Sequence, residues 1–134
     1  MKNLKEEIQE AINLYKLQKF AEAEFLSKKL LKNNQKVAFL YNLVGLILSS
    51  QKKFTEAIQY YEKGIALQPD YAMIYNNLGT IYKTLKKNNE AEKNYKKSIE
   101  LDNKIPESHN NLGNLYIDLN KHQEAVKCFK KSIK

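Results

Sequence analysis

Arginine is absent from this chain of 134 residues, and all 23 of its basic residues are lysines. The net charge of +8 invites a nucleic-acid partner. Arginine, however, is the residue favoured for bidentate contacts to guanine and for clasping phosphates. Fifteen asparagines accompany the lysines, a pairing typical of AT-rich coding sequence. We therefore interpret the charge as a solvated, lysine-rich surface and predict no nucleic-acid partner.

Cysteine, histidine and long apolar runs are equally scarce. The lone Cys128 cannot form an internal disulfide, and two scattered histidines provide no metal set. No apolar run approaches the roughly 18 residues of a membrane span, so we expect no membrane insertion. The first residues mix acids and bases where a signal peptide needs a basic start and a clean apolar run, so we expect a cytoplasmic protein.

Motifs for catalysis are missing as well. The chain has no glycine-rich loop between a strand and a helix and no H-E-x-x-H. His109 is expected to pack inside a helical hairpin, His122 to lie in a polar turn, and Cys128 to be a buried structural thiol. The sequence therefore predicts that the protein is not an enzyme and needs no cofactor.

What the chain does contain is an internal repeat with a period of 34 residues. Residues 72–100 match residues 106–134 at 14 of 29 positions. Small residues fall into the same register at Gly45, Gly79, Gly113, Ala23, Ala57, Ala91 and Ala125. A fixed period of about 20–50 residues marks a repeat array.

Each period contains two apolar patterns with the steps of three and four that indicate a helix. In the clearest copy these patterns cover residues 72–86 and 89–101, with a short polar reversal at 86–88, so the two helices must form an antiparallel hairpin. Gly79 interrupts the first helix at a cost of about 1 kcal/mol relative to alanine. We expect a close approach of the partner helix to offset that cost, with Ala91 facing Gly79.

This pattern resembles the tetratricopeptide repeat, which has a period of about 34 residues and runs W-x2-L-G-x2-Y, then A-x3-F, then P. The copy at 72–105 supplies Tyr75, Leu78, Gly79, Tyr82, Ala91 and Tyr95. The resemblance implies an all-α fold, a right-handed superhelix or solenoid of stacked antiparallel helix pairs, with about three and a half units. One domain is expected over 1–134, with repeats at 4–37 (degenerate), 38–71, 72–105 and 106–134 (incomplete).

Residues at the repeat boundaries agree with this division. Pro69 follows a second helix, where a helix must stop, and Asp70 is a candidate N-cap for the next helix. Pro106 suits a first helical turn. The sequence stops within the last predicted helix without a capping helix. We expect either that the chain is the N-terminal piece of a longer protein, or that self-association through this end covers it.

The resemblance also implies that the first helix of each repeat lines a concave groove for a partner protein or peptide. The peptide-binding residues expected there are Phe39, Asn42, Leu43, Leu46, Met73, Asn76, Asn77, Thr80, Lys83, Asn110, Asn111 and Asn114. The second helices carry most of the lysines of the last two repeats: Lys93, Lys96, Lys97, Lys127, Lys130 and Lys131. Phosphate-driven binding needs clustered positive charge facing the ligand, so this placement disfavours RNA in the groove.

The sequence is compatible with two modes of peptide binding. Asn77 and Asn111 resemble the asparagine ladder of O-linked N-acetylglucosamine transferases, in which amides hold an extended peptide backbone. An asparagine-rich sequence, however, places asparagine at polar sites by composition alone. The apolar Phe39, Leu43 and Leu46 instead suit an amphipathic helix. The carboxylate clamp of chaperone-binding domains is disfavoured, because Ile8, Glu107 and Asn111 stand where its basic residues would fall.

The function that follows is a non-catalytic scaffold for protein–protein interaction. The alternative is the N-terminal substrate-recognition arm of a larger enzyme, such as a glycosyltransferase or a sulfotransferase.

Overall fold

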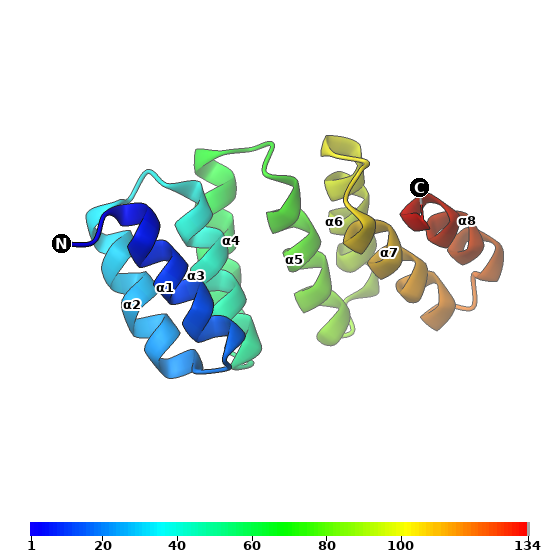
Figure 1. The fold of residues 1–134 in the computed structure, drawn as a ribbon. Coiled ribbons are helices and arrows are strands. Elements are labelled where there is room, and N and C mark those ends of the chain that lie inside the picture. Colours follow the sequence, from blue (N-terminus) through cyan, green and yellow to red (C-terminus); the bar gives the residue numbers. More distant parts are fainter. Residues whose placement is uncertain (134) are drawn as a thin grey trace. The chain divides into compact units, whose positions relative to one another are not determined.

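The computed structural model describes residues 1–133, and Figure 1 shows the course of the chain. Over this range the protein contains eight α-helices and no strand. The helices are α1 (Leu4–Lys16), α2 (Phe20–Asn33), α3 (Ala38–Ser50), α4 (Phe54–Leu67), α5 (Ala72–Thr84), α6 (Asn88–Leu101), α7 (Pro106–Asp118) and α8 (His122–Ile133). Helices α1, α3, α5 and α7 begin at Leu4, Ala38, Ala72 and Pro106.

The chain divides into two compact units, Met1–Pro69 and Asp70–Lys134. In the first unit α3 packs against α1, α2 and α4, and in the second α7 packs against α5, α6 and α8. Helix α3 is the most apolar of all the described helices, which suits its central place. In each unit, one helix thus contacts all three of the others.

The turn inside each helix pair is built in the same way all four times. A single residue with positive φ follows the first helix: Gln18, Lys52, Lys86 and Asn120, with φ between 59° and 64°. In the third pair, the Lys87 N–H donates to the Tyr82 carbonyl at 2.8 Å and the Lys86 N–H donates to the Lys83 carbonyl at 3.0 Å. These two bonds are those of a Schellman motif, which satisfies carbonyls left over at a helix end. The reversal covers residues 85–87 rather than the predicted 86–88, because Asn88 already belongs to α6.

The mid-helix glycines make room for an aromatic ring and not for an alanine. A Cβ atom added at Gly79 would lie 2.7 Å from Cδ1 and Cε1 of Tyr95, and one at Gly113 would lie 2.7 Å from Cε1 of Phe129. The Tyr61 ring covers Gly45 in the same manner. The prediction that Ala91 is the residue facing Gly79 is therefore wrong, since the ring of Tyr95 takes that place. Ala91 is itself fully buried.

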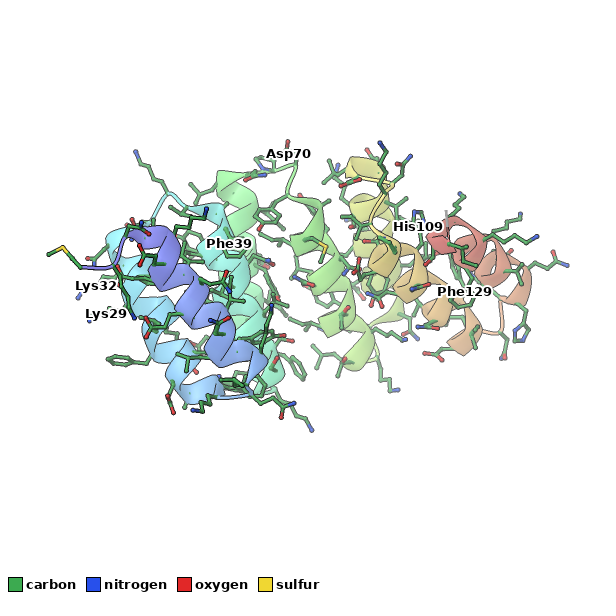
Figure 2. All side chains as sticks on the ribbon, viewed as in Figure 1. Lys29, Lys32, Phe39, Asp70, His109 and Phe129 are labelled. Atoms are coloured by element: carbon green, nitrogen blue, oxygen red, sulfur yellow. The ribbon has the colours of Figure 1, made fainter. Side chains whose placement is uncertain are left out.

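Two further predictions concern helix starts. Pro106 is the first residue of α7, as predicted, where its missing N–H costs nothing. Asp70, labelled in Figure 2, does not cap α5. The N-cap residue is Tyr71, and no side chain accepts a hydrogen bond there. The reason is the register of the repeat, which starts α5 at Ala72 and leaves Asp70 one residue too early.

Candidate functional site

Three of the predicted groove residues line one hollow on the α5 and α7 side of the second unit. This hollow, of about 500 Å³, is called the α5–α7 hollow below. It is lined by Thr80, Lys83, Thr84, Lys86, Asn88, Tyr95, Asn111 and Asp118. The lining offers hydroxyl, amide, ammonium and carboxylate groups, which is a suitable set for a polar ligand such as a peptide backbone.

A hydrogen bond between two asparagine side chains joins α5 to α7 beside the hollow. Nδ2 of Asn111 donates to Oδ1 of Asn76 at 3.0 Å. Asn76 is only 3% exposed, whereas Asn111 is half-buried. Asn76 is therefore a link between the two helices rather than a surface residue, and Asn111 presents the outer part of the pair.

Two more contacts fix the polar lining. Oγ1 of Thr80 lies 3.1 Å from the hydroxyl of Tyr95, so α5 and α6 meet through their side chains. Burial raises the pKa of Tyr95, which therefore stays protonated and able to donate a hydrogen bond at neutral pH. Lys83 Nζ lies 3.5 Å from Asp118 Oδ2 across α5 and α7. Because the Asp118 side chain is 59% exposed, this ion pair is weak and its members can exchange it for a ligand.

The other predicted residues of the second unit lie outside the lining of the hollow. Asn110 and Asn114 are exposed on α7, while Met73 and Asn77 are half-buried on α5. The Asn111 side chain bonds to Asn76, the residue next to the predicted ladder residue Asn77 in the preceding repeat.

In the first unit, burial removes half of the predicted surface. Phe39, labelled in Figure 2, is 39% exposed, and Leu46 is half-buried. Asn42 and Leu43 are 6% and 3% exposed. A partner cannot use these two side chains as an accessible apolar or polar surface, because little of either reaches solvent.

The peptide-binding residues expected from the sequence leave out five of the eight lining residues: Thr84, Lys86, Asn88, Tyr95 and Asp118. The ring of Tyr95 is buried against Gly79, while its hydroxyl reaches Thr80. Lys86 and Asn88 come from the turn between α5 and α6. The short turn and the positive φ of Lys86 bring these two residues to the hollow. Neither feature of the turn can be predicted clearly from the sequence.

Within residues 1–133, no group of three histidine, cysteine or acidic residues could hold a metal ion. None of the described helices is both long and apolar enough to cross a membrane.

The helix pairs, their 34-residue register and the glycine–aromatic packing define a helical repeat protein. The family model of the tetratricopeptide repeat matches residues 36–104 and 70–134, and the chain belongs to that family. This membership and the eight described helices confirm the predicted fold class, an all-α array of the tetratricopeptide solenoid type.

Solved structures with the same fold include two bacterial proteins. A crystal structure of MamA has a TM-score of 0.82 at 24% identity and covers 98% of this chain and 77% of its own. MamA from Desulfovibrio magneticus RS-1 gives 0.80 at 23%, covering 98% and 74%. PilF of Pseudomonas aeruginosa gives 0.87 at 20%, covering 97% and 60%. At these identities the likeness concerns the fold. A search of curated proteins found no match.

Proposed function

We propose that this chain is a non-catalytic module for protein–protein interaction and that it holds a peptide segment of a partner in the α5–α7 hollow. The observation that carries the proposal is the half-buried amide of Asn111, fixed by Asn76 at the edge of a polar hollow of about 500 Å³. Membership of the tetratricopeptide family supports the general role.

The chemistry of the lining favours a peptide backbone over an apolar ligand. An asparagine amide has two N–H donors and a carbonyl acceptor, and Asn76 uses only one of the donors of Asn111. The remaining N–H and the carbonyl match the C=O and N–H of one peptide unit. Lys83 and Lys86 add two positive charges to the lining and Asp118 adds one negative charge, so a polar segment fits better than a strongly charged one.

A partner is first isolated with the full chain, and its binding segment is synthesised as a peptide. The test then compares the Kd of this peptide for the unchanged chain and for the Asn111→Ala variant. Loss of a hydrogen bond to a buried partner group costs about 1–3 kcal/mol, so we expect the Kd to rise by about 5- to 150-fold. Asn89→Ala is the matched control, because Asn89 is an exposed asparagine of α6 that does not line the hollow.

The second variant is Asn77→Ala combined with Asn111→Ala, which tests the ladder. A ladder predicts a larger loss for the double variant than for Asn111→Ala alone. If neither variant changes the Kd relative to Asn89→Ala, the hollow is not the binding site.

A further inference from the structure

A groove lies on the other side of the second unit, between α6 and α8 with α7 as its floor. It consists of two adjoining hollows, of about 280 and 760 Å³, which share Ile99, His109 and Lys131. It is called the α6–α8 groove below. The floor of the smaller hollow comes from α7 with His109 (labelled in Figure 2), Leu112 and Tyr116. This groove shares no lining residue with the α5–α7 hollow.

The first unit shows what usually fills this space. Residues 68 positions apart occupy the same place in the two units, so Tyr41 corresponds to His109 and Tyr60 to Cys128. In the first unit the two tyrosine rings lie 6.5 Å apart between centroids. One polar contact is kept in both units. The Tyr41 hydroxyl donates to the Gln35 carbonyl at 2.9 Å, and Nε2 of His109 lies 2.8 Å from the carbonyl of Asn103, the counterpart of Gln35.

The second unit has therefore exchanged the Tyr60 ring for the single sulfur atom of Cys128. The smaller hollow lies at this position, with Cys128 in its wall. Lysines still surround the place of the missing ring. In the first unit, Lys28 and Lys63 lie 5.7 and 5.4 Å from the centroid of the Tyr60 ring. Their counterparts, Lys96 and Lys131, line the hollow.

The first unit also has an ion pair across this position whose counterpart is not formed in the second unit. Lys28 joins α2 to α4 by binding Glu56 at 2.7 Å. The counterparts are Lys96 and Glu124, which both line the smaller hollow. No ion pair between them is formed in the described part of the chain, where Lys96 binds Glu92 of its own helix at 3.2 Å instead. The groove is thus neither filled by a ring nor bridged across its top.

Positive charge dominates the rim of the groove. Lys104, Lys127 and Lys131 have no ion-pair partner within residues 1–133. The acids that line the same groove are Glu100 and Glu124, of which Glu100 lies 3.8 Å from Lys97 outside it. Burial raises the pKa of the Cys128 thiol, and the nearby Lys131 and Lys96 oppose that shift. Four lysines (Lys96, Lys104, Lys127 and Lys131) and two acids thus line a groove whose floor includes Leu112 and whose wall includes Cys128.

We propose that the α6–α8 groove docks an acidic peptide segment of a partner, which inserts one large apolar side chain over Cys128. The inserted side chain takes the place that the Tyr60 ring has in the first unit. Carboxylates beside it pair with Lys127 and Lys131, as Glu56 pairs with Lys28 in the first unit. The partner thus supplies in trans what the first unit supplies from its own sequence.

The experiment uses the full chain and a fluorescein-labelled peptide with one phenylalanine between runs of glutamate. We expect saturable binding with a Kd below about 1 mM, weakened by salt. Iodoacetamide should alkylate Cys128, the one cysteine of the chain, more slowly when the peptide is bound. Serine in place of phenylalanine should weaken binding, and lysine in place of glutamate should abolish it.

Two variants separate the parts of the proposal. Lys127→Glu with Lys131→Glu reverses the rim and should raise the Kd about tenfold or more. Lys93→Glu with Lys130→Glu, at exposed sites outside the groove, is the charge-matched control. Cys128→Tyr restores the residue of the first unit, so the helical content should be kept while binding is lost.

Three outcomes would overturn the proposal. The first is the absence of saturable binding, and the second is equal loss of affinity in the groove variant and its charge-matched control. The third is a single-stranded RNA that binds as tightly as the peptide and is equally weakened by Lys127→Glu with Lys131→Glu, since a polyanion site needs no apolar side chain. Asn111→Ala should leave this binding unchanged, so failure here is distinct from failure at the α5–α7 hollow.

Discussion

A methyl group added at Gly79 would meet the ring of Tyr95 at 2.7 Å. Carbon atoms in contact normally stay about 3.5–4.0 Å apart, so the ring or the helix must move by about 1 Å. Tyr95 is 1% exposed and has little room to move. Overpacking of this kind costs about 1–3 kcal/mol, while alanine gains about 1 kcal/mol over glycine in a helix interior. We therefore expect Gly79→Ala to lower the free energy of unfolding by up to about 2 kcal/mol.

The reasoning is tested by a double-mutant cycle with Tyr95→Leu. Removing the ring creates the space that the methyl group needs, so only the gain in helix propensity remains. In that background Gly79→Ala should raise the free energy of unfolding, by up to about 1 kcal/mol. A change of sign between the two backgrounds is the predicted result, and it does not depend on the cost of Tyr95→Leu itself.

The assay is urea unfolding of the full chain followed by far-ultraviolet circular dichroism. The midpoint and the slope are compared for the four proteins of the cycle, because a changed slope would mean that the unfolded or native state has changed in compactness. Two results would contradict this reasoning: Gly79→Ala stabilises the protein with Tyr95 in place, or it lowers the free energy of unfolding equally in both backgrounds. In either case, the contact with the Tyr95 ring is not the reason for a glycine at position 79.

Three other substitutions probe stability. Lys86→Gly should raise the free energy of unfolding by about 0.5–1 kcal/mol in the same urea assay, because φ at this residue is 64° and an L side chain is strained there. Asn111→Ala should lower it by about 1–3 kcal/mol by leaving the buried carbonyl of Asn76 unpaired, a loss that Asn111→Asp should not repair because it removes the donor. The hydrogen bond from Lys28 lowers the pKa of Glu24 to about 2 from 4.5, so its contribution is complete above about pH 4.5 and is lost as the pH falls towards 2. Glu24→Gln should remove that part of the acid dependence of the urea midpoint, and an unchanged pH profile would contradict it.

Several expectations from the sequence stay predictions. They include the absence of a nucleic-acid partner, self-association through the last helix pair, and the division into one domain over 1–134. The role as an arm of a larger enzyme is also untested, and no residue of the α5–α7 hollow favours it. The RNA comparison proposed for the α6–α8 groove addresses the first of these directly.

The candidate site could be predicted only in part. The repeat register placed Thr80, Lys83 and Asn111 on one side of a hairpin, and these three do line a common hollow. It also placed Asn42 and Leu43 on a surface, and the structure buries both. Helical spacing tells which residues share a face, but it does not tell how closely a neighbouring helix covers that face.

The amino-acid sequence by itself determined the architecture of this protein. A period of 34 residues with helical apolar spacing is enough to specify helix pairs and their starting points, because those depend on short-range register. Tertiary structure alone decided which atoms fill the spaces between helices. It put the Tyr95 ring rather than Ala91 over Gly79, and it left a hollow where Cys128 replaces a tyrosine. Packing of that kind depends on side-chain volume at several positions at once, and a linear pattern does not record it.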